Sequence, residues 1–482
     1  MSPRLRAFYI IPALLIVIAL QAQLRDWLFR SDPQNVHRTI STQVGLSTAA
    51  LFDSGPSPSP SPVYTLAADT PASPIASEES AQITYEEAIY IPSSPAVSTE
   101  DKARQIGIFT ELWATVKEKY LYHDYNGLDW NAIRGEYREL IEDGLSFDDF
   151  YAAMEEMIWR LGDDHSVFLT PEKASKEDMK YAGNTDFVGI GVLLSAIPER
   201  QRAVILAVFP GGSAEEAGLQ ARDSILTVNG EAILDEQGGL KQLIKGPEGS
   251  QIALTVQSPR QPERELALTR KRVSGPIPVP YTVITTQQDR RLGYILLVTF
   301  ADQTVEQQVG EALQVMSISA PLDGLILDNR YNEGGASTVL NGVLGYFSHG
   351  ELGHFISREK EKVLRVEGRD LGGSQPVPLV ILVGAHTYGY GEIFAGVLQD
   401  VGRAYIIGEN TGGNVETLKG YNFSDGSRAW IAYTSFRPLN KLHMNWEGIG
   451  IVPDQVISSA WDDHPFESDP AVEAAIFYLS GE

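Results

Sequence analysis

One turn of the chain has the pattern of a catalytic turn but lacks the side chain that would do the chemistry. The segment AHTYGYGEIFAGVLQD (385–400) follows an apolar run (377–383) and is patterned as a helix, so a strand-to-helix turn is expected between them. Such a turn can present a nucleophile beside the first backbone N–H groups of a helix. From Gly384 to Glu392 there is no serine or cysteine, and Thr387 is the single alcohol side chain.

Composition excludes several other chemistries. The chain has no cysteine, so a thiolate nucleophile, a disulfide and a cysteine metal site are all ruled out. Its eight histidines show no ligand spacing such as HExxH, and no phosphate-binding loop is present, so no metal or cofactor is predicted. The formal net charge of −25 disfavours a nucleic-acid partner and binding flat on an anionic membrane, because both need clustered Lys and Arg.

The N-terminus is typical of an export signal. Two arginines precede an uncharged apolar run at residues 7–22, and a low-complexity tract follows it. Residues 1–30 are interpreted as a cleaved signal peptide or a retained anchor. The anchor is favoured because Leu20 makes a poor small-residue cleavage site and Trp27 suits a membrane interface. The rest of the chain is then expected outside the cytoplasm, anchored to the cytoplasmic membrane by residues 7–22.

Four further regions differ in composition and in the spacing of their apolar residues. Residues 31–98 are rich in Ser, Pro, Thr and Ala, which predicts a disordered tether. Apolar residues recur at spacings of three and four in residues 99–182, which predicts a small helical subdomain. Residues 183–272 combine short strands, glycine turns and a short helix, LKQLIKG, in a β-rich module. Residues 273–482 alternate apolar strands with helices, which predicts an α/β core with a sheet buried on both faces. The helical subdomain and this core are expected to form one unit, with the β-rich module inserted between them.

The β-rich module resembles the PDZ domain of the C-terminal processing (tail-specific) serine peptidases. The matching segments are FVGIGV (187–192), GGSAEEAGLQARDSILTVNGE (211–231) and LIKGPEGSQI (243–252). The resemblance implies that N–H groups of the glycine loop hold a terminal carboxylate, and that the following strand accepts the ligand as an added strand. A groove that is closed to ligands stays the alternative. The implied peptide-binding residues, in the loop and in the apolar wall of the short helix, are Val188, Gly189, Ile190, Gly191, Leu240, Leu243 and Ile244.

The resemblance to this family extends over residues 100–460. Its other motifs are LGDDHSVFLTP (161–171), GLILDNRYNEGG (324–335), the segment 385–413 and NWEGIGIVPD (445–454). It implies an α/β peptidase core with a layered, ClpP/crotonase-like sheet, an N-terminal helical subdomain and an inserted PDZ domain. It also implies acyl transfer to a serine. In the family the turn before the helix reads Ser-Ala-Ser-Glu, whereas here it reads Gly-Tyr-Gly-Glu. Glu392 fixes the register, so Gly389 occupies the nucleophile position.

The position of the catalytic base is also altered. The tail-specific branch uses a lysine, and Asn414 stands there, which cannot take up the proton. The loop GENTGGN is closer to the tricorn-type branch, in which a histidine is the base and a glutamate assists it. His165 and Glu447 fall at those positions, and a histidine suits proton transfer near neutral pH. Simpler interpretations are that His165 bonds a neighbouring backbone group and that Glu447 stabilises a turn.

Backbone N–H groups remain available as hydrogen-bond donors even where the catalytic side chains are replaced. The resemblance places an oxyanion site at the N–H of Tyr390 and of Gly334 or Gly335, which could bind a carbonyl or carboxylate without cleavage. We therefore expect a membrane-tethered homologue that binds the C-terminal tails of exported or membrane proteins and has lost proteolysis. One alternative is an active serine-type endopeptidase that cleaves exported proteins near their C-termini, through Thr387 or a water at His165. Another is a scaffold with a filled, silent cleft.

Overall fold

The computed structural model describes residues 97–163, 165–181, 185–440, 445–458 and 460–481. They belong to one compact unit, Tyr90–Glu482. The predicted signal anchor and almost all of the predicted tether lie outside the described residues. Within those residues, no helix is long and apolar enough to cross a membrane.

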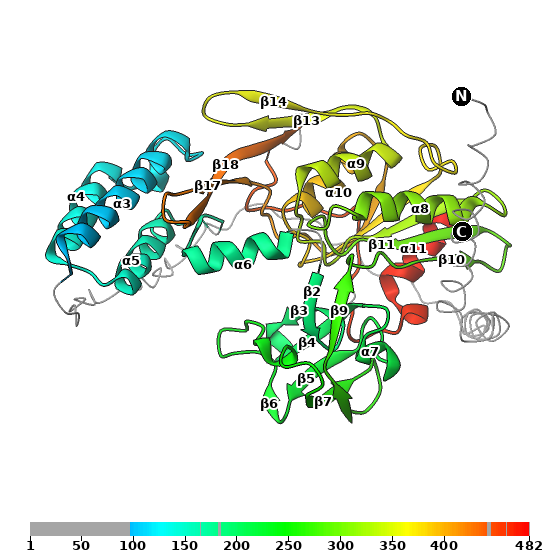
Figure 1. The fold of residues 1–482 in the computed structure, drawn as a ribbon. Helices are drawn as coiled ribbons and strands as arrows, with labels where there is room; N and C mark the ends of the chain where they lie inside the picture. Colours follow the sequence, from blue (N-terminus) through cyan, green and yellow to red (C-terminus); the bar gives the residue numbers. More distant parts are fainter. Residues whose placement is uncertain (1–96, 164, 182–184, 441–444, 459, 482) are drawn as a thin grey trace, which may run out of the picture. The chain divides into compact units, whose positions relative to one another are not determined.

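A six-stranded sheet forms the centre of the peptidase-like region (Figure 1). The first two strands in its order are antiparallel and all later neighbours are parallel. Every residue of the third and fourth strands is buried, as expected for strands covered on both faces. The order is β10 (Tyr281–Thr285), β11 (Arg291–Leu296), β12 (Gly324–Asp328), β15 (Leu379–Val383), β16 (Tyr405–Gly408) and β19 (Gln455–Val456).

Helices cover both faces of this sheet, because successive strand side chains point to opposite sides. Leu325 and Leu327 pack into the core formed with three helices on one face, and Ile326 packs into the core formed with one helix on the other. The layered α/β architecture predicted from the sequence is therefore confirmed. The helices on the first face are α8 (Val305–Ser317), α9 (Ser337–Phe347) and α10 (Tyr390–Asp400), and the helix on the second is α11 (Pro470–Ser480).

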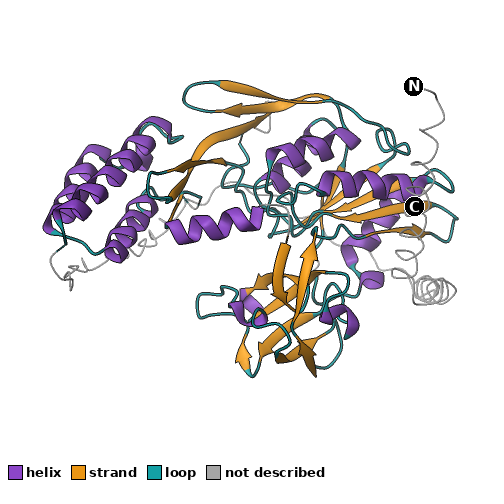
Figure 2. Cartoon of the chain, viewed as in Figure 1, coloured by secondary structure: helices purple, strands orange, loops and turns teal. Residues whose placement is uncertain are grey.

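The N-terminal region is helical, as Figure 2 shows, and packs on a second sheet. Its first three helices begin after Ser98, Asp129 and Ser146, whose side chains accept backbone N–H groups as N-caps. The helices are α3 (Thr99–Lys119), α4 (Trp130–Asp143), α5 (Phe147–Trp159) and α6 (Pro171–Tyr181), with a 3-10 turn, η2 (Tyr125–Gly127). The second sheet contains β1 (Val167–Leu169), β13 (Gly350–Ile356), β14 (Glu361–Val366), β17 (Thr417–Asn422) and β18 (Arg428–Pro438).

The β-rich module has a sheet of its own and is joined to the core by a pair of strands. The pair, β2 (Thr185–Gly189) and β9 (Lys271–Gly275), is antiparallel. The sheet has the order β3 (Val192–Ile197), β4 (Arg202–Val208), β5 (Ser224–Val228), β7 (Gln251–Gln257) and β8 (Arg264–Thr269), with β6 (Glu231–Ala232) beside β5. Short helical turns are α7 (Ser213–Glu216), η3 (Pro198–Arg200) and η4 (Gln242–Ile244), and η5 (Phe466–Ser468) lies in the core.

The predicted helix over LKQLIKG is wrong. Only the three-residue turn η4 forms there. Leu240 makes an isolated bridge with Leu234, and the N–H of Gly246 donates to the carbonyl of Val188. Because backbone groups at both ends of the segment are bonded to residues outside it, only the short turn η4 forms between them.

A buried network of ion pairs joins the β-rich module to the core. Asp469, fully buried at the N-cap of α11, lies 2.8 Å from Nη1 of Arg222 and 2.8 Å from Nη2 of Arg330. Arg330 also contacts Asp328 at the end of β12, and Arg222 lies over the ring of Trp461. Two guanidinium groups thus face two carboxylates, so the charges balance away from water.

We expect Asp469→Asn to destabilise the fold strongly. The change leaves two buried guanidinium groups facing a single carboxylate, and breaking a buried pair from one side costs about 3–5 kcal/mol. Urea denaturation of the purified chain measures the loss. The control is Asp463→Asn, which removes an exposed partner of Arg200 and should cost about 1 kcal/mol or less. Equal losses for the two variants would contradict a structural role for Asp469.

Candidate functional site

The turn before α10 holds a glycine where a side chain would fit. Gly389 is the N-cap of α10, with φ +55° and ψ −123°. A Cβ built on it would lie 3.4 Å from the carbonyl oxygen of Glu333 and 3.9 Å from that of Asn414. The space beside the backbone is therefore open, but the positive φ is a conformation that favours glycine over other residues.

Glu392 fixes this turn to the loop that follows β16. Its side chain is fully buried and its two oxygens accept four hydrogen bonds. Oε1 accepts from the hydroxyl of Thr411 at 2.5 Å and the N–H of Gly413 at 2.7 Å. Oε2 accepts from the N–H of Asn414 at 2.8 Å and of Gly389 at 3.2 Å. Burial raises the pKa of Glu392, and these hydrogen bonds oppose the rise.

The other hydroxyls near the turn are already used or displaced. Thr387 is fully buried, its Oγ1 donates to the carbonyl of Asn329 at 2.9 Å, and it accepts from the N–H of Gly384 at 3.1 Å. The ring of Tyr388 lies so close to Gly412 that a Cβ there would be 2.0 Å from it. The hydroxyl of Thr387 therefore stabilises the turn and is poorly placed to act as a nucleophile.

Two backbone donors of the expected oxyanion site are available. The N–H of Gly334 donates to Oδ1 of Asn332 at 2.9 Å, so this group is taken. The N–H groups of Gly335 and Tyr390 have no acceptor among the described residues. The two segments are adjacent, since a Cβ on Gly334 would lie 2.7 Å from the nitrogen of Tyr390. Of the predicted alternatives, Gly335 with Tyr390 is the pair left to bind an oxygen.

His165 and Glu447 lie together although 282 positions separate them. Nε2 of His165 is 3.0 Å from Oε1 of Glu447, and the histidine side chain is 7% exposed. Oε2 of Glu447 accepts from the N–H groups of Val415 at 2.8 Å and Glu416 at 3.1 Å. Burial lowers the pKa of His165, but the hydrogen bond and charge of Glu447 outweigh it and raise the pKa overall. Glu447 thus both stabilises a turn and orients the imidazole.

Local structure explains the position of each member of the pair. The carboxylate of Asp163 accepts the N–H of His165 at 3.0 Å, which fixes the turn after α5. The N–H of Gly448, next to Glu447, donates to the carbonyl of Gly413 at 2.7 Å. The N–H of Gly389 donates to the carbonyl of Asn414 at 2.8 Å. A continuous set of contacts therefore connects the vacant turn to the His165–Glu447 pair.

Asn414 contributes its backbone to the site. Its N–H binds Glu392 and its carbonyl accepts from Gly389, whereas its side chain has no hydrogen bond among the described residues. Lysine is the base at this position in the tail-specific branch. Lys419, the nearest lysine in the described part of this loop and strand, lies in β17, over the rings of Tyr421 and Tyr433.

Sequence reasoning missed Glu416. This carboxylate is 6% exposed and accepts a hydrogen bond from the hydroxyl of Tyr122. Burial, followed by the charge of Glu447, raises the pKa of Glu416 to about 7. Its side chain lies close to both His165 and Glu447. No spacing in the sequence indicates this, because the three residues come from three separate loops.

The glycine loop of the β-rich module is shorter than expected. Val188 and Gly189 belong to β2 and pair with Arg272 and Lys271 of β9. The loop proper is formed by Ile190 and Gly191, whose φ is +83°. Val188 and Gly189 therefore position the loop through the strand pair, and only the following two residues can turn N–H groups toward a ligand.

The apolar wall beside this loop is only partly available to a ligand. Leu240 and Leu243 are half-buried, while Ile244 is 8% exposed and belongs to the core of the module. β3 forms one edge of the module's sheet in the described structure. Strand addition requires an edge strand and an apolar pocket, and the two half-buried leucines pack against the same core as Val192 of β3.

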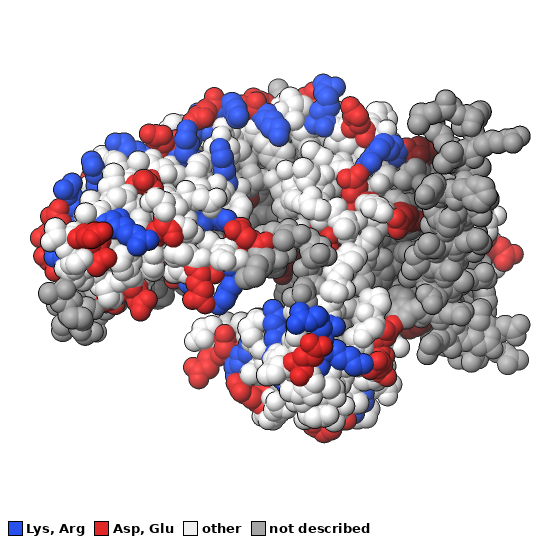
Figure 3. Space-filling view, in the orientation of Figure 1, with Lys and Arg blue, Asp and Glu red and all other residues white. Residues whose placement is uncertain are grey.

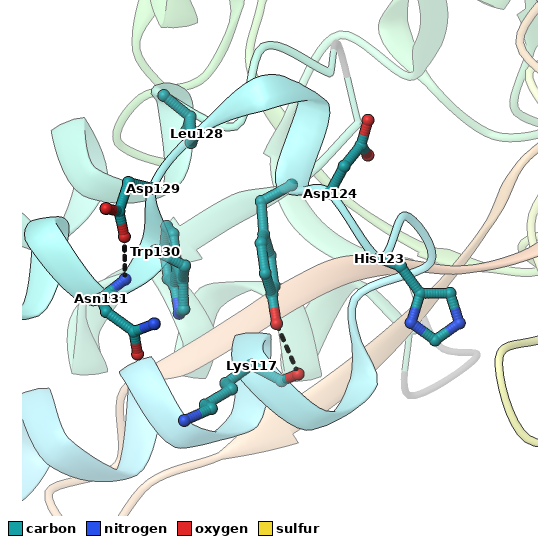
Figure 4. A pocket seen from close by; sticks show the side chains of 8 residues that line it. Lys117, His123, Asp124, Leu128, Asp129, Trp130 and Asn131 are labelled. Atoms are coloured by element: carbon teal, nitrogen blue, oxygen red, sulfur yellow. Dashed lines mark hydrogen bonds between the residues drawn. The ribbon is translucent and has the colours of Figure 1, made fainter.

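A separate pocket of about 240 Å³ lies on the helical subdomain and contains none of the predicted site residues (Figure 4). It is formed where α3 and α4 are joined, and the hydroxyl of Tyr125 there donates to the carbonyl of Lys117 at 3.0 Å. Its lining residues are Lys117, His123, Asp124, Tyr125, Leu128, Asp129, Trp130 and Asn131.

We expect Glu392→Gln to loosen the turn and the loop together. A glutamine has one acceptor oxygen, so part of the four-donor arrangement loses its partner, and each unpaired buried donor costs about 1–3 kcal/mol. Urea denaturation measures the change in unfolding free energy. Glu409→Gln is the matched control, because Glu409 lies on the same loop but outside this arrangement. A loss no greater than in the control would contradict the anchoring role of Glu392.

Three family models match the chain in order. The tricorn protease C1 domain matches residues 102–159, a PDZ domain matches residues 204–258 and peptidase family S41 matches residues 291–457. These segments fall on the helical subdomain, the β-rich module and the α/β core. The predicted PDZ fold of the module is thereby confirmed.

Relatives and solved structures agree with these matches. The chain is 28% identical over 401 residues to the carboxyl-terminal-processing protease of Synechocystis sp., covering 81% of this chain and 89% of that protein. It is 24% identical to the carboxy-terminal processing protease CtpB of Bacillus subtilis, covering 62% and 60%. The structure of a photosystem II D1 C-terminal processing protease matches with a TM-score of 0.54 and 26% identity, covering 75% and 94%.

The fold is also shared with a putative S41 protease of Bacteroides fragilis, at a TM-score of 0.51 and 16% identity, covering 81% of this chain and 99% of that one. Helical subdomain, PDZ domain and layered core occur here in the order that these matches require. The chain therefore carries a peptidase family S41 region and a PDZ domain, and it is similar over most of its length to the carboxyl-terminal-processing proteases.

Proposed function

We propose that the chain binds the C-terminal tails of exported or membrane proteins through its PDZ domain and does not hydrolyse them. The observation that carries the proposal is Gly389, which leaves the nucleophile position without a side chain. Thr387, the nearest alcohol, is buried and committed to Asn329 and Gly384.

The remaining groups favour binding over cleavage. Without the serine nucleophile, the backbone donors and substrate positioning still give about 10³–10⁴-fold acceleration over water in serine peptidases. The N–H groups of Tyr390 and Gly335 are suited to hold a carbonyl or carboxylate oxygen. A bound tail would thus be held in the cleft with its peptide bonds intact.

The PDZ domain supplies the recognition. The edge of β3 can pair with an extended tail, and the loop of Ile190 and Gly191 lies at the start of that strand. Leu240 and Leu243 favour an apolar side chain at or near the terminus. On the face drawn in Figure 3, Lys and Arg side chains are interspersed with Asp and Glu, which suits a polypeptide partner better than a polyphosphate one.

The proposed location rests on the sequence. The apolar run at residues 7–22 follows two arginines and precedes the long Ser/Pro-rich tract, as in a signal anchor. Tethering by this segment would keep the PDZ domain near the membrane, where the tails of newly exported proteins emerge.

The second candidate function is an active serine-type endopeptidase. It is favoured by the His165–Glu447 pair, which is oriented as a base with its assisting acid. The ring nitrogen left to accept a proton is Nδ1, which is buried and has no partner in the described part of the chain. This function needs a hydroxyl or an activated water that reaches His165.

We expect the wild-type chain to leave a disordered substrate with an apolar C-terminus uncut in the presence of a chelator. Gly389→Ser should gain cleavage, because the space at position 389 is open, and Gly389→Ser combined with His165→Ala should lose it again. Mass spectrometry of the products measures cleavage and locates it.

Cleavage by the wild type that disappears in His165→Ala would overturn the proposal and favour the endopeptidase. An inert Gly389→Ser variant that is folded by circular dichroism would show that His165 is not aligned with position 389. The proposal that the wild type does not cleave would then still hold, but His165 would not be a retained catalytic base.

We expect the PDZ domain to bind a fluorescent peptide with a free apolar C-terminus at least about tenfold more tightly than the same peptide with an amidated end, a difference of about 1.4 kcal/mol. Leu243→Asn should weaken binding by a similar factor. The matched control is Leu266→Asn, a half-buried leucine of the same core on β8, at the opposite edge from β3. Fluorescence anisotropy measures both, and equal affinities for the two peptides would contradict carboxylate recognition.

A further inference from the structure

Three side chains beside the vacant turn form a set of metal ligands. One ring nitrogen of His165 and one carboxylate oxygen each of Glu416 and Glu447 lie within 4.8 Å of one another. We propose that these residues bind a divalent transition-metal cation, with Zn²⁺ as the best match. The proposal is independent of the missing serine and of the PDZ domain.

The donor types select the class of ion. Zn²⁺ binds imidazole nitrogen at about 2.0–2.1 Å and carboxylate oxygen at about 2.0–2.2 Å, so the side chains need to close by less than about 1 Å to share one ion. Ca²⁺ and Mg²⁺ prefer shells made only of oxygen, and an imidazole ligand disfavours them. Three protein ligands leave the fourth position of a tetrahedral zinc ion to water.

The groups around the cluster already hold the ligands in place. Oε2 of Glu447 is fixed by the N–H groups of Val415 and Glu416, which leaves Oε1 directed at His165. Oε1 of Glu416 is held by the hydroxyl of Tyr122, which leaves its second oxygen for a ligand. Hydrogen bonds of this kind orient the ligating atoms in metal sites.

His165 is the basic member of the cluster, and its two carboxylates have no Lys or Arg partner among the described residues. The side chain of His165 is more than nine-tenths buried and directs Nε2 into the cluster, and Glu416 is 6% exposed. Two neighbouring carboxylates that are largely removed from water repel each other unless a cation or a proton lies between them. A bound cation of charge +2 would neutralise both.

The test uses the untagged full chain after treatment with a chelator. Isothermal titration with ZnCl₂ should show a site with one ion per chain, and thermal unfolding should shift to higher temperature, whereas MgCl₂ and CaCl₂ at the same concentration should have no effect. Glu416→Gln should weaken Zn²⁺ binding at least about tenfold. Glu409→Gln, on the same loop but outside the cluster, should bind Zn²⁺ as the wild type does.

The outcomes separate this site from others on the chain. If Glu416→Gln fails to fold, His165→Gln takes its place, since it removes the imidazole and keeps a polar side chain. Absence of Zn²⁺ binding to the wild type, or binding that a folded ligand variant retains unchanged, overturns the proposal. Neither result would alter the cleavage measurement, which is made with a chelator present, or the peptide-binding measurement, which probes the PDZ domain and none of these three residues.

Discussion

A buried carboxylate with two cationic partners is the constraint on which the described structure depends most. Asp469 begins α11, pairs with Arg222 from the PDZ domain and pairs with Arg330 at the end of β12. Away from water, each charge must meet its partner, so the network admits few other arrangements. The loop that starts at Arg330 continues to Gly335, so the N–H of Gly335 lies on a segment held by the same carboxylate that pairs with the PDZ domain.

The shape of the turn at Gly389 does not depend on the side chain at that position. Its shape comes from the four hydrogen bonds of Glu392 and from the hydroxyl of Thr387, and none of these involves the side chain at position 389. A residue other than glycine held at positive φ carries strain of about 1–3 kcal/mol. Glycine is free of this strain, so a glycine at position 389 is expected to stabilise the turn relative to a serine.

The sequence was sufficient for the architecture and for part of the site. Apolar runs predicted the strands of the buried sheet. The order of the motifs predicted His165 and Glu447 as members of one site, and Nε2 of His165 lies 3.0 Å from Oε1 of Glu447 in the structure. The helix over LKQLIKG failed because the N–H of Lys241 donates to the carbonyl of Ile233 and that of Gly246 to the carbonyl of Val188, both outside the segment. Glu416 could not be predicted, since its surroundings come from loops that only the folded chain brings together.

The paired strands β2 and β9 have a consequence for how the chain can be rebuilt. Thr185 lies opposite Gly275 and Gly189 opposite Lys271, so the PDZ domain leaves and rejoins the core at neighbouring points. Adjacent strands lie about 4.8 Å apart, a gap that a two-residue hairpin turn closes. The PDZ domain can therefore be removed or replaced at these two junctions without moving the ends of the core apart. Any replacement must bring its own cation to the place of Arg222, or Asp469 loses one of the two guanidinium groups that it pairs with.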